Sequence, residues 1–231
     1  GEVTLRLDGE TLFISCGRFS SSIQCLSDSG NYPDMQFNGD SFSVKLDSDQ
    51  CAKMINETVF ATSAEESKPV LTGVLIELGS EISFVATDAF QFAKRSMAMR
   101  IPSEERSMIV PSKSMVEISR MMDAVSGEAE LTFTKTHVSV SVGSERLIAR
   151  LLDGNYIKYQ NILPKDHNAR VCLDKRELME SIDRAQLMTR DGNNNILMKF
   201  VDGKVTISAN SHAGKVSEEV DEQKAGGDIV I

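Results

Sequence analysis

The sequence predicts an α+β fold, in which antiparallel sheets are covered by helices and the same unit occurs more than once. Three observations support this prediction. Blocks of sequence recur about 125 residues apart, helix-initiation patterns precede amphipathic segments, and short alternating segments are joined by turn residues. We therefore expect repeated domains rather than one large core.

The repeat emerges when the sequence is aligned with itself. Four pairs of blocks match in the same order: GEVTLRL (1–7) with GEAELTF (127–133), SCG (15–17) with SVG (141–143), VKLDSDQCAKMINETVFATS (44–63) with VCLDKRELMESIDRAQLMTR (171–190), and EISFVATDA (81–89) with KVTISANSH (204–212). Gly-Asn-Tyr also occurs twice, at 30–32 and 154–156. We expect the chain to start late in one copy and end midway through another, as a piece of a longer chain of at least three copies. The alternative is a duplicated two-domain protein with irregular ends.

Two helices are expected to begin at capping boxes. The boxes are Asp47-Ser48-Asp49-Gln50 and Asp174-Lys175-Arg176-Glu177. In each box the Asp can accept a hydrogen bond from an unpaired backbone N–H, and the Gln or Glu can reach back. Apolar residues then follow at helical spacing: Cys51, Met54, Ile55, Val59 and Phe60 in the first segment, and Leu178, Ile182 and Ala185 in the second. Both segments are expected to be half-buried helices.

A third helix is expected at Pro111, whose fixed φ suits a first helical turn. Met115, Ile118 and Met122 follow at helical spacing. We interpret this stripe as core packing rather than as a cofactor site.

Between the helices the apolar pattern changes to a period of two, which is typical of strands. Hairpin turns are expected at four dipeptides: Gly79-Ser80, Lys135-Thr136, Gly143-Ser144 and Asp202-Gly203. The expected unit is a strand, a helix, several strands, a second helix and several further strands. This order nearly repeats within the unit, which suggests two half-units.

The composition indicates a globular protein. Of the 231 residues, 41% are hydrophobic and 26% are charged, which is enough apolar material for one or two domains. No segment suits a membrane helix and the first residues lack a signal-peptide layout, so we expect a cytoplasmic protein without membrane partners. The net charge of −9 opposes non-specific nucleic-acid binding unless basic residues gather on one face.

The sequence contains no recognisable catalytic motif. It lacks phosphate-binding glycine loops, nucleophile elbows and the His-Glu-x-x-His zinc pattern. The three histidines occur in unrelated contexts: His137, His167 and His212. The four cysteines stand alone and are expected to be small buried thiols: Cys16, Cys25, Cys51 and Cys172. Asp88 follows an expected strand and is interpreted as a turn cap rather than as a catalytic carboxylate. Because no catalytic or metal-binding pattern is found, we expect no catalytic residue, metal or cofactor.

Three longer segments occur in an informative order: LTGVLIELGSEISFVATDAFQFA (71–93), IVPSKSMVEISRMM (109–122) and LLDGNYIKYQNILP (151–164). Their order, spacing and internal period resemble the bacterial β sliding clamp family, the DNA polymerase III beta subunits. The resemblance covers essentially the whole chain. It implies a DNA clamp fold with two helices in each domain, three domains in each full-length chain and a ring built from two chains.

The resemblance also implies a domain division and a function. Residues 1–40 would be the C-terminal part of clamp domain 1, residues 41–166 the complete domain 2, and residues 167–231 the N-terminal half of domain 3. The implied partners are double-stranded DNA, the replicative DNA polymerase, the clamp loader, repair proteins and translesion polymerases, and a second copy of the full-length chain. No catalysis is implied. Because half a domain would leave strand edges exposed, we expect domain swapping or aggregation of this chain.

One implied surface faces DNA. Lys113 matches best, because it follows Val-Pro at the start of a helix, where clamps carry a DNA-facing lysine. The other candidates are Lys53, Lys68, Arg120, Arg176 and Arg184. The alternative for each is a solvated helix face. Pro69 and Val70 replace a pair of aromatic residues of some clamps, which weakens any expectation of stacking on single-stranded DNA.

The second implied surface is an apolar pocket for short hydrophobic peptides of partner proteins. The resemblance places nine residues around it: Leu71, Thr87, Ala89, Phe90, Gln91, Phe92, Ile157, Asn161 and Ile162. Family members often have Gly-His-Arg-Leu where this chain has Ala-Phe-Gln-Phe, and a common proline is Ile157 here. We therefore expect a more apolar and less basic pocket. The alternative is that Phe92, Ile157 and Ile162 are plain core or interdomain packing.

Two other classes of protein were weighed. A repeated α+β module could be an interaction scaffold that never meets DNA. A cysteine-dependent hydrolase could use Cys51 or Cys172, and it would require a thiol with a depressed pKa.

Overall fold

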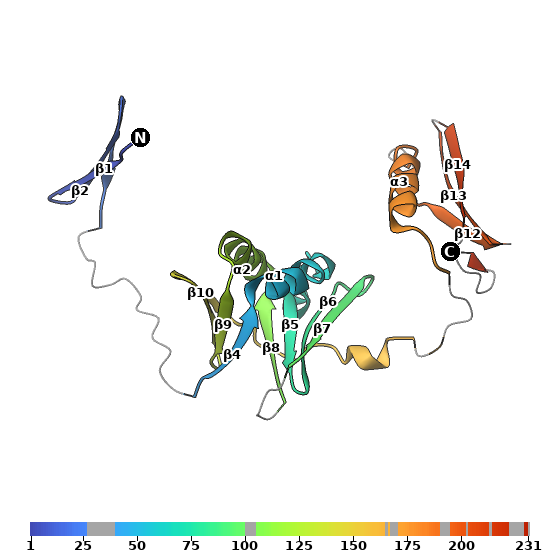
Figure 1. Cartoon of the computed structure of the whole chain (residues 1–231), viewed down its shortest axis with the longest axis horizontal. Helices are drawn as coiled ribbons and strands as arrows, with labels where there is room; N and C mark the ends of the chain where they lie inside the picture. Colours follow the sequence, from blue (N-terminus) through green and yellow to red (C-terminus); the bar gives the residue numbers. More distant parts are fainter. Residues whose placement is uncertain are drawn as a thin grey trace. The chain divides into compact units, whose positions relative to one another are not determined.

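The computed structural model describes residues 1–26, 40–99, 105–164, 166, 171–189, 195–201, 203–212, 214–221 and 229–230. The chain divides into two compact units, residues 1–157 and 158–231. Figure 1 shows the elements in chain order. The three-part division with boundaries at 40 and 166 stays a prediction.

The first strands form a sheet of their own. This antiparallel sheet has the order β1-β2-β3 and consists of β1 (Thr4–Asp8), β2 (Thr11–Cys16) and β3 (Phe19–Gln24). Its apolar side chains alternate with polar ones, so that Leu5, Leu7 and Ile23 lie on one face and stay exposed.

Two four-stranded antiparallel sheets follow. The first has the order β11-β10-β9-β4 and consists of β4 (Phe42–Asp47), β9 (Glu128–Phe133), β10 (His137–Val142) and β11 (Glu145–Arg150). The second has the order β7-β6-β5-β8 and consists of β5 (Gly73–Leu78), β6 (Glu81–Thr87), β7 (Phe92–Ala98) and β8 (Arg106–Pro111). The predicted hairpins at Gly79-Ser80, Lys135-Thr136 and Gly143-Ser144 are confirmed.

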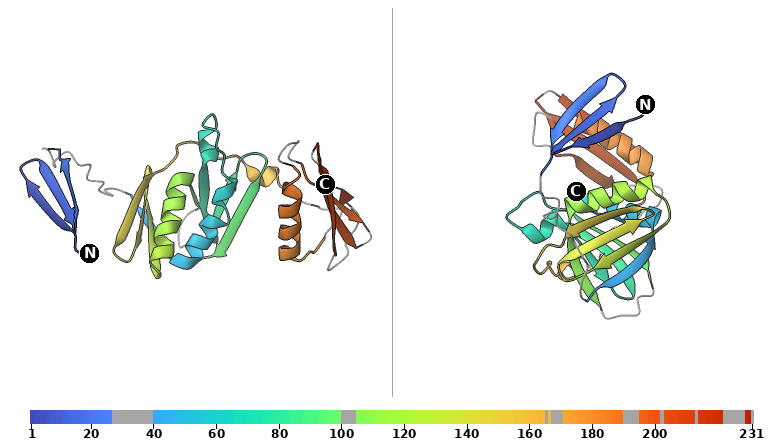
Figure 2. Two further views of the ribbon diagram at one scale, coloured as in Figure 1. Left: turned by 90° about the horizontal axis from the view of Figure 1, so that it is seen from above. Right: turned by 90° about the vertical axis from the view of Figure 1, so that its left-hand side faces the viewer.

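Two helices cover these sheets. The helices α1 (Ser48–Asn56) and α2 (Ser112–Ala124) pack against each other, and α2 contacts strands of both sheets. Figure 1 and the view from above in Figure 2 show them side by side over the strands. Ser119 of α2 donates a hydrogen bond of 3.0 Å to the side-chain oxygen of Asn56 at the end of α1. Two short 3₁₀ helices, η2 (Val59–Ala61) and η3 (Pro69–Thr72), lead from α1 to β5.

One apolar core joins both sheets and both helices. Ile55 of α1, Met115 of α2, Phe84 of β6 and Phe133 of β9 are all fully buried. Each such side chain contributes about 1.5–3 kcal/mol relative to an exposed one. The predicted stripe of Met115, Ile118 and Met122 is therefore confirmed as core.

In the described residues of the second unit, the helix α3 packs on a four-stranded sheet. After η4 (Tyr159–Asn161) comes α3 (Lys175–Gln186), followed by β12 (Leu197–Val201), β13 (Lys204–Ser211), β14 (Gly214–Asp221) and β15 (Ile229–Val230). The sheet order is β14-β13-β12-β15. Ala185 of α3 packs in a buried cluster with Val205 and Ile207 of β13.

The predicted helix starts are confirmed at both capping residues. Asp47 accepts a hydrogen bond of 3.0 Å from the backbone N–H of Gln50. Asp174 accepts two, from Arg176 at 2.9 Å and from Glu177 at 3.1 Å. Such caps each stabilise a helix by about 1 kcal/mol.

The structure also confirms the internal repeat. The order β7-β6-β5-β8 in the central part matches β14-β13-β12-β15 in the second unit, element by element. Gly17 after β2 and Gly143 after β10, which the aligned blocks pair, have φ values of +59° and +56°. Both glycines therefore make the same left-handed hairpin turn, a conformation that strains most other residues.

Three expectations were wrong. Phe60 is 63% exposed, because α1 ends at Asn56 and the tighter η2 changes the direction of the following side chains. Pro111 ends β8 and caps α2 with ψ 137°, so it lies outside the first helical turn. Of the cysteines, Cys51 is buried, whereas the other three are partly exposed: Cys16, Cys25 and Cys172. Cys16 and Cys25 lie at strand ends of the uncovered N-terminal sheet, which explains their exposure.

Across the residues that the structure describes, no helix combines the length and the apolar character needed to cross a bilayer.

Candidate functional site

The loop between β6 and β7 is held in one shape by Asp88. Its Oδ1 accepts hydrogen bonds from the backbone N–H groups of Phe90 at 2.8 Å and Gln91 at 2.7 Å. Its Oδ2 accepts a third bond, of 3.0 Å, from the side chain of Gln91. The bonds from Gln91 and Phe90 lower the pKa of the Asp88 carboxyl, because they stabilise its charged form. The interpretation of Asp88 as a turn cap is confirmed.

Thr87 and Ala89 complete this loop. Thr87 donates its hydroxyl to the carbonyl oxygen of Gln91 at 2.6 Å and accepts a bond of 3.1 Å from the backbone N–H of Ala89. Ala89 has φ +82°, a left-handed conformation that costs a non-glycine residue roughly 1–2 kcal/mol. The hydrogen bonds of Asp88 and Thr87 offset this cost and hold the loop in place. Phe90, which is 97% exposed, lies at the tip of the loop.

Tyr156 ties the end of the Gly-Asn-Tyr segment to this loop. Its phenol oxygen accepts a hydrogen bond of 3.1 Å from the backbone N–H of Thr87. Burial raises the pKa of Tyr156 to about 12, since the charged phenolate is poorly solvated there. The sequence-based site did not include Tyr156. Its recurrence in the repeated Gly-Asn-Tyr was the one signal that could have identified it.

Gly154 brings a second segment to the same place. A Cβ on this glycine would lie 2.7 Å from Cγ1 of Val70 in η3, and its φ is +132°. The chain at 154 therefore passes directly against η3, where Leu71 is buried. Gly154 and Tyr156 thus link η3 with the loop after β6, two parts of the sequence that were both assigned to the pocket.

The predicted pocket residues fall into three groups. Leu71 and Thr87 are buried, and Ile157, next to Tyr156, is half-buried. The loop residues are exposed: Ala89, Phe90, Gln91 and Phe92. Asn161 and Ile162 lie at η4 of the second unit and are exposed. Their assignment to one common pocket stays a prediction.

The predicted DNA-facing residues differ in their charge partners. On the helices of the first unit, Lys53 lies 4.0 Å from Glu57, and Arg120 lies 2.6 Å from Glu117. Within the described residues, the side chains of Lys68 and Lys113 form no ion pair, and both are exposed. The surfaces of α1 and α2 therefore carry both signs, and Lys113 of α2 and Lys68, which precedes η3, are exposed cations without an ion pair among the described residues.

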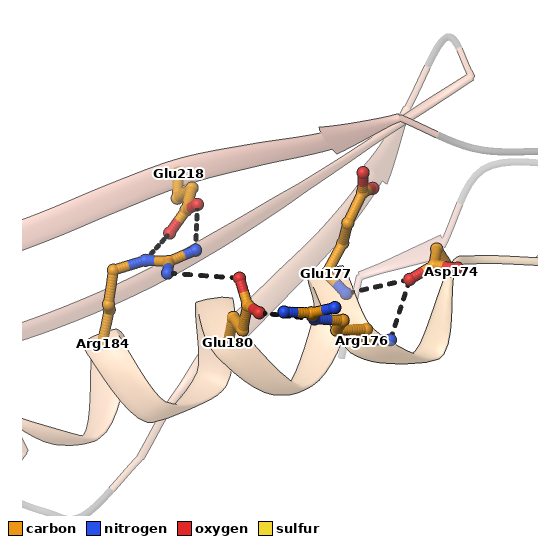
Figure 3. A network of polar contacts seen from close by, with 6 residues as sticks. All are labelled: Asp174, Arg176, Glu177, Glu180, Arg184 and Glu218. Atoms are coloured by element: carbon orange, nitrogen blue, oxygen red, sulfur yellow. Dashed lines mark hydrogen bonds and ion pairs between the residues drawn. The ribbon is translucent and has the colours of Figure 1, made fainter.

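On α3 both predicted arginines are neutralised by carboxylates (Figure 3). Arg176 donates a bond of 3.0 Å to Glu180. Arg184 donates two hydrogen bonds to the carboxylate of Glu218 of β14, one of 2.9 Å from Nε and one of 2.5 Å from Nη2. It also lies 4.0 Å from the carboxylate of Glu180. The bond to Glu218 raises the pKa of Arg184, and the same bond lowers the pKa of Glu218. Arg184 is thus oriented toward the protein's own carboxylates.

The buried Cys51 does not fit a cysteine nucleophile. Burial raises the pKa of its thiol to about 12, whereas a nucleophilic cysteine needs a depressed pKa. Cys172 is partly exposed. Among the described residues there is also no cluster of three side chains suited to hold a metal ion.

Comparisons with known proteins point in one direction. Residues 45–158 match the family model described as "DNA polymerase III beta subunit, central domain", and residues 160–231 match "DNA polymerase III beta subunit, C-terminal domain". The beta sliding clamp of Bacillus subtilis (strain 168) is 32% identical over 199 residues, which cover 84% of this chain and 52% of that protein. The beta sliding clamp of Staphylococcus aureus (strain Mu50) is 32% identical over 194 residues, 82% of this chain and 51% of that protein. The chain thus spans about half the length of these relatives.

Solved structures agree with the sequence comparisons. The DNA polymerase sliding clamp from Bacillus subtilis has a TM-score of 0.89 and 28% identity, covering 99% of this chain and 62% of that chain. The DNA polymerase III beta chain from Streptococcus pneumoniae TIGR4 has a TM-score of 0.87 and 28% identity, with the same coverage. The repeated helix-on-sheet units therefore have the fold of these proteins.

Proposed function

This chain belongs to the DNA polymerase III beta subunit family, and from this premise we propose that it functions as part of a sliding clamp. The complete protein encircles duplex DNA as a ring of two chains and keeps a replicative DNA polymerase on its template. It acts by topology and docking, without catalysis, metal or cofactor, in the cytoplasm.

One observation carries this proposal. Two consecutive units of the chain repeat the same strand order, and they match two consecutive domains of the family in the family's order. A chain of repeated domains that share one fold is suited to surround a rod-shaped ligand, because each domain contributes an equivalent surface.

The helix surfaces support the sliding part of the proposal. A protein that slides needs weak and mobile contacts with phosphates, since strong ones would hold it in place. The mixture of basic and acidic groups on α1, α2 and α3 fits this need, and Lys113 of α2 and Lys68 beside η3 are among the exposed cations without an ion pair in the described part of the chain. Lys113 lies in the first turn of α2, the position that the resemblance assigned to a DNA-facing lysine.

The loop after β6 supports the docking part. We propose that Phe90 and Phe92, with Leu71 and Thr87 behind them, receive short hydrophobic peptides of partner proteins. An exposed aromatic side chain on a rigid loop binds with little loss of conformational freedom. The proposed partners are the replicative polymerase, the clamp loader, repair proteins and translesion polymerases.

A peptide titration tests the proposal. Fluorescence anisotropy of a labelled Gln-Leu-x-Leu-Phe peptide should show saturable binding to the chain. Phe92→Ala should weaken it about tenfold or more, as truncation of an aromatic contact of 1.4 kcal/mol or more does. Phe19→Ala is the matched control, because Phe19 is an exposed phenylalanine of the N-terminal sheet. Equal affinity of both variants, or no saturable binding at all, would contradict the docking assignment.

A further inference from the structure

At several equivalent positions, the central part and the second unit carry charges of opposite sign. The aligned blocks relate α1 to α3 by an offset of 127, and β6 and β7 to β13 and β14 by an offset of 123. The strand register confirms the offset of 123. Phe84 of β6 pairs with Arg95 of β7, and the equivalent Ile207 of β13 pairs with Glu218 of β14. Equivalent positions with inverted charge are Asp49 and Arg176, Lys53 and Glu180, Glu57 and Arg184, Arg95 and Glu218, and Glu81 and Lys204.

These equivalent residues make equivalent contacts. In the central part, Glu57 at the end of α1 lies 4.0 Å from Lys53 and 3.1 Å from Arg95 of β7. In the second unit the central residue is Arg184, which lies 4.0 Å from Glu180 and is joined by two hydrogen bonds to Glu218 of β14 (Figure 3). A cation, an anion and a cation in one unit are an anion, a cation and an anion in the other.

One further position of the hairpins carries inverted charge. Glu81 of β6, which lies 3.3 Å from Lys94 of β7, is equivalent to Lys204 of β13, which lies 2.7 Å from Glu219 of β14. The partners of these two residues are not equivalent positions, because the offset of 123 relates Lys94 to Ser217 and Ser96 to Glu219. The inversion in the strands is therefore limited to Glu81 with Lys204 and Arg95 with Glu218.

The apolar contacts of the two units are much less distinctive than these charges. Both helices present a short stripe of aliphatic or sulfur-containing side chains to a sheet of the same strand order. Hydrophobic contact is non-directional, and repeated domains characteristically misassemble by exchanging equivalent elements. If α1 packed on the sheet of the second unit, Glu57 would face Glu218. In the reverse exchange Arg184 would face Arg95.

We propose that the inverted charges are a pairing code, by which each helix and strand selects its own unit while the repeated domains fold. Each correct pairing forms an ion pair, and each exchanged pairing replaces it with two like charges. The occupant that the code excludes is the equivalent element of the other repeat, in the same chain or in a second copy.

Charge-swap variants of the whole chain test the code while keeping the helix-to-strand ion pair of each unit; only the intrahelical contacts of 4.0 Å with Lys53 and Glu180 become like-charged. Glu57→Arg with Arg95→Glu keeps the pair in the central part but gives it the same signs as the second unit. Arg184→Glu with Glu218→Arg does the converse. The quadruple variant makes both swaps and restores opposite signs. Each protein is refolded from urea, and correctly folded monomer is quantified by size exclusion with light scattering.

The code predicts a non-additive result. Each double variant should increase the misassembled fraction about twofold to fivefold, which corresponds to a pairing preference of about 0.4–1 kcal/mol. The quadruple variant should return to the wild-type yield. In 1 M salt, where the screening length is about 3 Å, wild type and double variants should become alike.

Two outcomes would overturn the proposal. One is a wild-type yield from both double variants. The other is a quadruple variant that refolds no better than Arg184→Glu with Glu218→Arg, since this would show a local cost of placing an acid in the last turn of α3. Urea unfolding of the refolded monomers separates native stability from pairing, because the like-charged intrahelical contacts with Lys53 and Glu180 lower the unfolding midpoint, whereas the code acts on the refolding yield.

Discussion

The phenol oxygen of Tyr156 accepts a hydrogen bond from the backbone N–H of Thr87 over 3.1 Å, and so joins two segments that are 69 residues apart. The bond fixes the end of β6 to the chain that leads out of the central sheets. It places the second copy of Gly-Asn-Tyr, at 154–156, beside the loop that carries Phe90.

Tyr156→Phe should destabilise the protein by about 1–2 kcal/mol, because the N–H of Thr87 loses its acceptor. The pKa of Tyr156 is raised from 10.0 to about 12, so the folded state favours the neutral phenol. The stabilisation is thus complete below pH 10 and is lost as the pH rises toward 12. Urea unfolding of both proteins between pH 8 and pH 12 measures it. The assignment would be contradicted if the difference in free energy of unfolding between the wild type and the variant were as large at pH 12 as at pH 8.

Gly154→Ala should destabilise the protein by about 2–4 kcal/mol, because the new Cβ meets Val70 at 2.7 Å in a backbone conformation that disfavours alanine. Gly127→Ala is the control, since Gly127 also has a positive φ, of +148°, but nothing lies within 4 Å of its Cβ position. Adding Val70→Ala should recover the steric part alone. Thermal unfolding compares the four proteins, and equal losses in the two glycine variants would exclude the predicted collision.

Ala89→Gly should stabilise the protein by about 0.5–1 kcal/mol, because glycine adopts φ +82° without strain while its greater freedom in the unfolded chain offsets part of the gain. Ala93→Gly in β7, where the alanine is buried, should instead be destabilising. Urea midpoints of the two variants test the contrast. A destabilised Ala89→Gly protein would mean that the loop stores no strain at this residue.

Lys113→Gln should reduce the salt dependence of duplex DNA association, lowering the slope of log K against log [salt] by about 1, the change expected for one lost phosphate contact. Arg184→Gln combined with Glu218→Gln should leave the slope unchanged, because this pair is already neutral. Anisotropy of a labelled duplex over a range of salt concentrations measures both slopes. A larger effect of the Arg184 and Glu218 substitutions would show that α3 contributes the dominant phosphate contact.

The candidate site shows where sequence reasoning ended. The resemblance to the clamp family assigned residues of the loop at 87–92 to the predicted pocket, and the turn cap at Asp88 could be inferred from its position after a strand. The roles of Tyr156 and Gly154 could not be inferred, because each depends on a contact with a distant segment, and the recurrence of Gly-Asn-Tyr marks Tyr156 without naming its partner. Phe60 was misassigned because helical periodicity carries no information about where α1 ends.

Local sequence patterns are sufficient to predict the helix starts, the hairpin turns and the repeat. The caps at Asp47 and Asp174 and the glycine turns depend on bonds within a few residues, so a short stretch of sequence specifies them. In contrast, the contacts of Tyr156 with Thr87 and of Arg184 with Glu218 follow from the folded arrangement of the chain. These partners lie 69 and 34 positions apart in the sequence. Whether they meet depends on the strand register and on the position at which a helix packs on its sheet. Register and helix placement are set by packing of the whole core, which no local pattern records.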